Sequence, residues 1–186
     1  ADMAVFGDLD GDGDKEIAIG ASGDDDGGNS RGAVHVLFYD YVPPTVLPTG
    51  CGGDGSMGSS GIPAPGETIF AVLDNPYGSQ NVGSFTFLFF SLSAPAPTCG
   101  IPMPGLHMDP NEPNGALLIN FPTIAAIVGP PFTGGTTVIP FGVPTSNAYL
   151  GLDIYVQGAI YDPFPSPGGV QLGLTGGRHY RIGACY

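Results

Sequence analysis

Basic residues are scarce in this chain. Lys and Arg total 4 against 17 Asp and Glu residues, which gives a formal net charge of −13. Nucleic acid is therefore excluded as a partner, because binding to phosphates needs a basic surface. No apolar run reaches the roughly 18 residues of a membrane-spanning helix. The three cysteines permit one disulfide and leave one thiol over.

Long stretches without glycine or proline are also rare. The 186 residues include 32 Gly and 20 Pro. Each of these residues costs about 1 to 3 kcal/mol inside a helix, so long helices are excluded. The glycines and prolines stand between apolar runs, as turn residues do in a strand-rich fold. Because 42% of the residues are hydrophobic and can build a core, the composition predicts an all-β protein.

No recognisable catalytic motif is present. The H-E-x-x-H, G-x-S-x-G and P-loop patterns are absent, and so is the C-x-x-C spacing of zinc and redox sites. The three histidines, His35, His107 and His179, are scattered along the chain. Asp109 and Glu112 are near enough in sequence to pair as acid and base, but a loop carboxylate pair is usually solvated. We therefore expect that the protein is not an enzyme.

The acidic residues are concentrated near the N-terminus. Residues 1–41 hold ten of the 17 carboxylates and two of the four cations. This shift in composition predicts a small β unit at residues 1–41 and a β-sandwich-like domain at residues 51–186. The proline-rich segment 42–50 between them is predicted to be a stiff linker, because proline fixes φ and favours extended backbone.

A calcium loop is predicted in the first module, between two apolar runs. Oxygen-bearing residues recur at alternate positions, which point to one side of a tight loop, and Gly13 permits the sharp turn because glycine tolerates positive φ. Hard oxygen ligands of this kind suit Ca²⁺ rather than zinc. The predicted ligands are the side chains of Asp8, Asp10, Asp12 and Glu16 and the backbone carbonyl of Asp14.

The charge density of this loop argues for a bound cation. Two carboxylates about 5 Å apart repel by roughly 3 kcal/mol at an effective dielectric constant of about 20, and four converging carboxylates form several such pairs. The alternatives are a solvated acidic turn without an ion and an EF-hand. An EF-hand needs Glu at position 12 and flanking helices, whereas position 12 counted from Asp8 is Ile19 and both flanks look like strands.

Residues 3–39 resemble an FG-GAP repeat, the blade unit of integrin-type β-propellers. The resemblance rests on Phe6-Gly7-Asp8, the D-x-D-x-D-G core, Ile19-Gly20-Ala21 and the strand-like run that follows Arg31. It implies that the loop carboxylates hold Ca²⁺, including Glu16, where many members carry Asp. A propeller has at least four blades. Either preceding blades have been removed, or the unit packs against something else and keeps an open sheet edge that can pair with another chain.

A second acidic cluster, Asp24-Asp25-Asp26, lies in the loop that joins the last two strands of this unit. The cluster is either a second metal site or, as is more usual for such a run, a solvated turn. The sequence leaves both interpretations open.

The second module is predicted to be an antiparallel β-sandwich of seven to eight short strands. Apolar runs alternate there with Gly/Pro turns, and the run Phe85 to Leu92 is apolar on both faces, as in a central strand. The candidate strands are Thr68 to Leu73, Ser84 to Leu92, Ala116 to Phe121, Thr136 to Ile139, Tyr149 to Tyr161, Val170 to Leu174 and Tyr180 to Gly183.

Residues 51–186 also resemble, more loosely, a C-terminal β-rich domain of secreted proteins from planctomycete-like bacteria. The resemblance rests on Gly50-Cys51-Gly52, on Cys99-Gly100 after a strand, and on Leu152 to Gln157 followed by Tyr161-Asp162-Pro163. That domain often follows FG-GAP repeats and implies no enzymatic activity.

We predict a disulfide between Cys51 and Cys99. Closing a loop of about 49 residues would stabilise the fold by about 4 kcal/mol in the chain-entropy model. Cys185 is then either a small buried hydrophobe or the site of an intermolecular bridge, and a competing pairing that involves Cys185 stays open.

These features favour a secreted, calcium-binding structural or adhesive protein. Ala1 is compatible with a mature N-terminus after removal of a signal peptide, and the composition resembles that of exported proteins. Head-to-tail self-association into a filament or surface layer would cover the single blade, so the expected partners are further copies or another extracellular protein. The alternative is a ligand- or carbohydrate-recognition module, for which the eight Tyr and eleven Phe residues offer stacking surfaces although Trp is absent.

Overall fold

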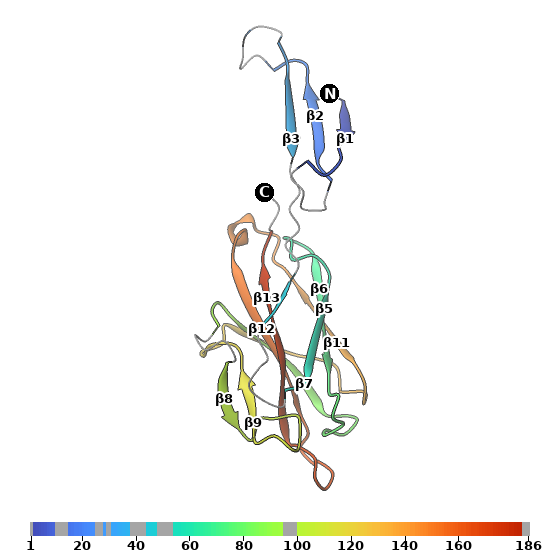
Figure 1. Ribbon diagram of the computed structural model, residues 1–186, viewed down its shortest axis with the longest axis vertical. Coiled ribbons are helices and arrows are strands. Elements are labelled where there is room, and N and C mark those ends of the chain that lie inside the picture. Colours follow the sequence, from blue (N-terminus) through green and yellow to red (C-terminus); the bar gives the residue numbers. More distant parts are fainter. Residues whose placement is uncertain are drawn as a thin grey trace. The chain divides into compact units, whose positions relative to one another are not determined.

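The computed structural model describes residues 2–9, 15–24, 28, 31–37, 44–47, 54–94 and 100–183. The chain divides into two compact units (Figure 1). Unit 1 comprises Ala1–Val42 with Ala184–Tyr186, and unit 2 comprises Pro43–Gly183. The regular elements of the described residues are β-strands, apart from one short 3-10 helix, η1 (Asn147–Tyr149). The predicted all-β class is therefore confirmed.

Unit 1 contains a three-stranded antiparallel sheet in the order β1 (Met3–Val5), β2 (Ile17–Ala21) and β3 (Ala33–Leu37). The central strand β2 pairs with β1 through Val5↔Ile17 and with β3 through Ile17↔Leu37. The apolar runs on both sides of the acidic loop are strands, as predicted, because short alternating apolar segments bounded by Gly and Asp favour extended backbone.

The described residues of unit 2 form three antiparallel sheets. The largest has the order β10 (Ala125–Val128), β7 (Phe85–Ser91), β12 (Asp153–Tyr161), β13 (Leu172–Arg181) and β4 (Thr45–Val46). The second has the order β11 (Thr137–Gly142), β6 (Thr68–Asp74) and β5 (Ser56–Ser60). The third is the hairpin of β8 (Ile101–Pro104) and β9 (Asn114–Leu117).

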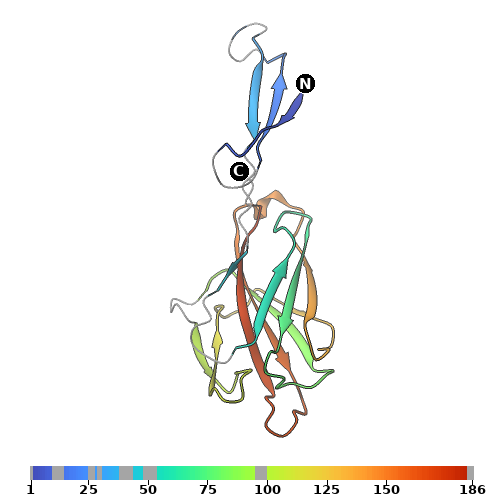
Figure 2. The same ribbon diagram turned by 45° about the vertical axis from the view of Figure 1, so that its right-hand side comes forward.

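The five-stranded and three-stranded sheets face each other across the main core, so unit 2 is a β-sandwich (Figure 2). Alternate residues of each strand point inward, since side chains of a strand alternate between its two faces. Phe141 of β11 joins the two sheets within this core: its ring packs edge-to-face on Phe90 of β7 (5.1 Å between centroids) and on Tyr180 of β13 (5.7 Å). Such aromatic pairs stabilise a core by about 0.5 to 1.5 kcal/mol beyond their buried area.

The β8–β9 hairpin covers part of the opposite face of the five-stranded sheet. Ala116 and Leu118 pack there with Leu47 and the partly buried Tyr155. Gln157 of β12 is buried beneath the hairpin and satisfies three backbone groups: its Oε1 accepts from Leu118 N (2.9 Å), and its Nε2 donates to Ala116 O (2.7 Å) and Thr175 O (2.9 Å). A polar side chain therefore joins the hairpin to the sandwich.

Several strands of unit 2 differ from the predicted ones. The two predicted strands at Val170 to Leu174 and Tyr180 to Gly183 form the single long strand β13, so this prediction is wrong. The predicted strand Tyr149 to Tyr161 begins only at Asp153, because η1 and the left-handed Gly151 (φ 77°) precede it. Strands β5, β8 and β10 were not predicted, and Thr45–Val46, inside the predicted linker, forms β4.

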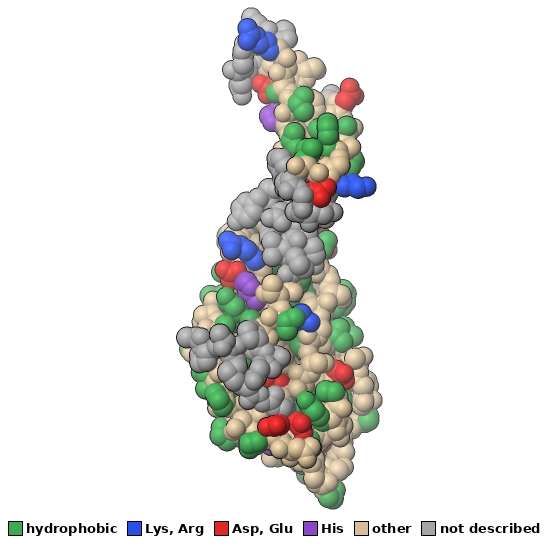
Figure 3. All heavy atoms as spheres, viewed as in Figure 1, with side chains coloured by type: hydrophobic (Ala, Val, Ile, Leu, Met, Phe, Trp, Pro, Cys, Tyr) green, Lys and Arg blue, Asp and Glu red, His purple; other side chains and the backbone are tan. Residues whose placement is uncertain are grey.

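Within each unit, the few basic side chains lie apart from one another on the face drawn in Figure 3. No helix in the described part of the chain is long and apolar enough to cross a membrane.

Cys51, Cys99 and Cys185 lie outside the described residues, so the predicted disulfide stays a prediction.

Candidate functional site

The acidic loop of unit 1 joins β1 to β2. Phe6 N donates a hydrogen bond to Glu16 O (2.7 Å), which extends the β1–β2 pairing one step beyond Val5↔Ile17. Backbone contacts therefore hold the two ends of the loop together. Asp8 follows one end, and Glu16 stands at the other, directly before β2.

Glu16 is fully buried (0% exposed) although it carries a carboxyl group. Its Oε2 accepts a hydrogen bond from Leu9 N (2.5 Å) across the loop. Its Oε1 is buried and has no hydrogen-bond partner. Because burying a carboxylate oxygen without a donor or a cation is strongly unfavourable, the environment of Oε1 fits a cation.

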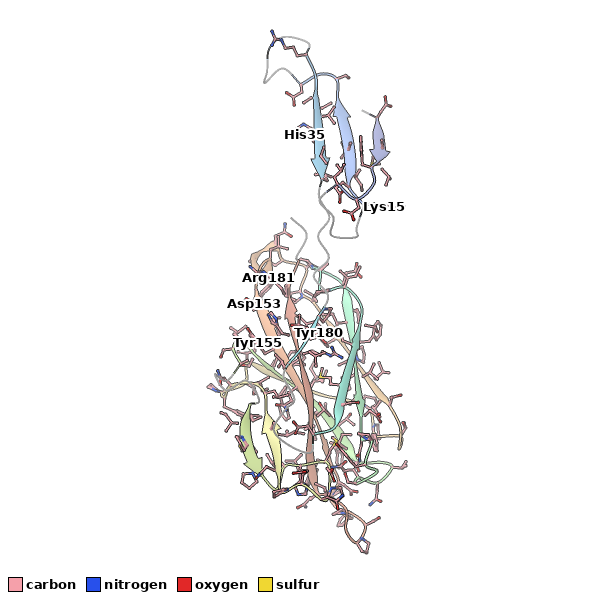
Figure 4. The ribbon with its side chains drawn as sticks, viewed as in Figure 1. Lys15, His35, Asp153, Tyr155, Tyr180 and Arg181 are labelled. Carbon is pink, nitrogen blue, oxygen red and sulfur yellow. The ribbon has the colours of Figure 1, made fainter. Side chains whose placement is uncertain are left out.

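The structure describes two of the five predicted calcium ligands. Asp8 and Glu16 lie at the two ends of the loop, whereas Asp10, Asp12 and Asp14 lie outside the described residues. Within the described ranges, no group of three or more His, Cys, Asp or Glu side chains gathers in a way that could hold a metal. The exposed Lys15 (Figure 4) precedes Glu16. The predicted ligand set thus remains a prediction that the environment of Glu16 supports.

The second acidic cluster contributes one described residue, Asp24, in the loop between β2 and β3. Its Oδ2 lies 3.5 Å from Nε2 of His35 on β3, and its backbone oxygen accepts a hydrogen bond from Gly32 N (3.1 Å). These contacts fix the hairpin end. Asp25 and Asp26 lie outside the described residues, and the choice between a metal site and a solvated turn stays open.

In unit 2 the structure brings together a polar cluster that the sequence did not predict. Nε2 of His179 on β13 lies 2.8 Å from Oδ1 of Asp153 on β12, and its Nδ1 lies 3.3 Å from Oγ1 of Thr45 on β4. The Tyr155 ring stacks on the imidazole at 4.7 Å between ring centroids. Figure 4 labels Asp153 and Tyr155 on β12. The separation of Asp153 and Tyr155 by one residue indicates that both side chains lie on the same face of a strand. Their contacts with His179 depend on the pairing of β12 with β13, which the local sequence does not predict.

Of the two carboxylates considered as an acid–base pair, that of Asp109 takes part in a local turn. Asp109 Oδ1 accepts hydrogen bonds from the backbone N (2.9 Å) and Nδ2 (3.0 Å) of Asn111, and its backbone oxygen accepts one from Glu112 N (3.1 Å). Asp109 therefore stabilises a local turn.

Among the described titratable groups, Asp54 has a clearly shifted pKa. Its Oδ1 accepts a hydrogen bond from Ala116 N (2.8 Å), whereas its Oδ2 is buried without a partner. Burial raises the pKa of Asp54 to about 7, and the hydrogen bond from Ala116 opposes this rise. Sequence reasoning missed this residue, because its contact with Ala116 depends on where the β8–β9 hairpin packs.

Comparison with known proteins gives one match. The family model described as the FG-GAP repeat matches residues 4–37, which run from the second residue of β1 through the acidic loop and β2 to the end of β3. No curated protein and no solved structure matches the chain. Nothing in these comparisons supports the looser resemblance of residues 51–186 to a planctomycete-type domain. FG-GAP repeats are typical of β-propeller-type recognition or adhesion modules and of extracellular or surface proteins. An FG-GAP repeat is therefore detected at residues 4–37 of this chain.

Proposed function

We propose that this chain is a secreted, calcium-binding structural or adhesive protein, in which unit 1 docks onto a neighbouring subunit and leads to head-to-tail assembly. The FG-GAP repeat supports a recognition or adhesion role. No enzymatic activity is included in the proposal, because the sequence offers no catalytic motif.

The observation that carries the proposal is the apolar surface of unit 1. Met3, Val5 and Leu37 are exposed on one face of the sheet, and Val34 and Val36 are exposed on the other. Three short strands cannot bury two apolar faces by themselves. A partner sheet on each face would remove this surface from water, with a gain of about 25 cal/mol per Å² of buried apolar area.

Calcium has a structural role in this proposal. Asp8, Asp10, Asp12 and Glu16 would hold the ion with their carboxylates, together with the carbonyl of Asp14, and the ion would neutralise them. Glu16 Oε1, buried without a partner, is the oxygen that needs such neutralisation most. A neutralised loop keeps β1 and β2 in register, and this sheet is the docking element.

The test is the size of the full chain in calcium and in chelator. We expect assemblies larger than a monomer in millimolar calcium, dissociation in excess chelator and recovery when calcium is restored. Glu16→Gln removes one anionic ligand with little change in shape and should weaken the calcium response at least about tenfold. Asp2→Asn removes an exposed carboxylate of the same unit and should leave the response unchanged. A monomer indifferent to calcium would contradict the proposal.

A second candidate function is recognition of a glycan or another ligand by unit 2. The five-stranded sheet presents aromatic rings on its outer face: Phe87 stacks with Phe89 (6.1 Å between centroids), and the half-exposed Phe85 stacks with Tyr161 (6.4 Å). Flat apolar rings of this kind form a stacking platform. Binding of the monomer to a glycan array, lost in Phe85→Ala and kept in Val82→Ala, would favour this candidate over assembly.

A further inference from the structure

The outer strand β10 leaves an open edge on the five-stranded sheet of unit 2. β10 pairs with β7 through Val128↔Phe87 and Ala125↔Phe90, and no strand in the described part of the chain pairs with its other side. On the facing sheet β11 is likewise an outer strand, with β6 as its one neighbour among the described residues. An open strand edge offers unpaired backbone groups to another chain.

An apolar cavity of about 260 Å³ lies between these two outer strands. Ile124, Ala125 and Ile127 line it from the β10 side, and Phe141 and Val143 line it from the β11 side. Its walls contain almost no polar surface. The main core is therefore incompletely closed along this edge, in contrast to the close packing usual in protein interiors.

The same edge carries no charge. Residues 113–152, which contain β10, β11 and η1, include no Asp, Glu, Lys, Arg or His. Several large apolar side chains of this segment are exposed, among them Phe121, Ile124, Leu150 and Val128, the last at 67%. Edge strands of monomeric proteins are normally protected by Lys, Pro or a bulge, and β10 (AAIV) has none of these.

The charge of the chain indicates which partner fits this surface. The net charge is −13, and all 17 carboxylates lie outside residues 113–152. At this edge two copies meet through uncharged residues, so their pairing brings no carboxylates together. In an antiparallel two-fold pairing each residue faces the same segment of the other copy, which is unfavourable for a charged strand and tolerated by an uncharged one.

We propose that β10 pairs antiparallel with β10 of a second copy, so that the two five-stranded sheets become one continuous sheet. The pairing satisfies the open backbone edge, and the exposed apolar side chains around Ile124 and Val128 cover the cavity mouth. The proposal goes beyond the assembly proposed above, because it uses unit 2 alone and involves neither the acidic loop nor calcium.

The test is sedimentation velocity of the full chain in excess chelator, where calcium-dependent docking is switched off. We expect a monomer–dimer equilibrium at concentrations up to about 100 µM. Val128→Lys places two ammonium groups at the joined edges and should raise the dissociation constant at least about tenfold. Val82→Lys makes the same change at a side chain that is 72% exposed between β6 and β7 and should leave the equilibrium unchanged.

Each other outcome overturns the inference. If the wild-type chain stays monomeric at about 100 µM in chelator, β10 does not pair with a second copy. That result would not contradict the calcium-dependent assembly proposed above. A Val128→Lys variant that is folded by circular dichroism and dimerises like the wild type places the interface elsewhere. If Val128→Lys is unfolded, hydrogen exchange of the wild type decides: amides of β10 should gain protection as concentration rises, and protection at β5 instead would contradict the pairing.

Discussion

Asp54 shows at the scale of a residue how one buried carboxyl couples a hairpin to pH. Its Oδ1 holds Ala116 N of β9, and its Oδ2 has no partner in the buried interior. Because burial raises the pKa of Asp54 from 3.8 to about 7, the neutral form is favoured in the folded state at mildly acidic pH.

The sign of the pH dependence follows from this rise. Between about pH 4 and pH 7 the folded chain keeps a proton that the unfolded chain has released, so the contribution of Asp54 to stability falls as pH rises and levels off above about pH 7. Asp54→Asn keeps an acceptor for Ala116 N and loses the titration. The variant should therefore gain stability relative to the wild type from pH 4 to pH 7, by up to about 4 kcal/mol.

Urea unfolding at several pH values checks this prediction. Taking the difference in the free energy of unfolding between the two proteins at each pH cancels the contribution of the carboxylates that they share. Glu67→Gln, at an exposed site, serves as the control and should track the wild type. Parallel curves for Asp54→Asn and the wild type would show that Asp54 titrates normally.

Gln157 is the second residue on which the outer hairpin depends. Gln157→Leu keeps most of the side-chain volume but leaves Leu118 N, Ala116 O and Thr175 O without their hydrogen bonds. Each buried unsatisfied group costs about 1 to 3 kcal/mol, so we expect the free energy of unfolding to fall by at least about 3 kcal/mol. Gln171→Leu, at an exposed position, should change it little in the same denaturation series, and equal losses for both variants would rule out the network.

At the scale of the elements, apolar runs between Gly/Pro turns predicted the strands that pack in the main core. Strands β6, β7 and β11 lie within such runs. β8 was missed because Pro102 and Pro104 resemble turn residues, although proline is tolerated in an outer strand that needs few backbone donors. β10 was missed because four residues of an apolar run carry too little periodicity to distinguish a strand from a loop.

The continuous strand β13 illustrates why local sequence is not sufficient. Gly176 and Gly177 indicate a turn, yet both lie within the strand. A Cβ at Gly177 would stand 2.7 Å from Leu47 Cδ1, so the glycine permits close packing of the residue after β4. For the acidic loop, spacing predicted the ligand types, but the burial of Glu16 and its bond to Leu9 N depend on the folded sheet.

Gly158, beside the bulge of β12 between Gln157 and Ala159, tests this close packing. A Cβ there would lie 2.7 Å from both Leu73 Cδ2 and Thr175 Oγ1. We expect Gly158→Ala to lower the free energy of unfolding by about 1 to 3 kcal/mol through overpacking, measured by urea denaturation. Gly142→Ala in β11 has no atom within 4 Å of the new methyl group and should be neutral or stabilising. If Gly158→Ala left the free energy of unfolding unchanged, Leu73 and Thr175 would have moved to make room for the new methyl group.

At the scale of the whole molecule, the uneven charge controls how copies approach one another. Ten of the 17 carboxylates belong to residues 1–41, and none lies in residues 113–152. Net charge of this size keeps molecules apart in dilute salt, and the proposed pairing through β10 brings no carboxylates together.

Salt dependence follows from this distribution. Raising the ionic strength from about 0.01 M to about 0.15 M shortens the Debye length from about 30 Å to about 8 Å, which screens repulsion between copies while the apolar edge contact is unaffected. The dissociation constant of the chelator-resistant dimer should fall several-fold, as measured by sedimentation at fixed pH. A dimer that weakens with added salt would instead be held by ion pairs.

The first and last strands of unit 2 lie side by side, and this arrangement has a mechanical consequence. β4 runs antiparallel to β13, with Thr45 opposite His179 near the end of β13. Tension applied at the two ends of unit 2 would therefore peel the short strand β4 away one hydrogen bond after another, instead of loading a row of bonds together in shear. In an adhesive tether, this strand would act as a low-force release that lengthens the chain before the sandwich itself yields.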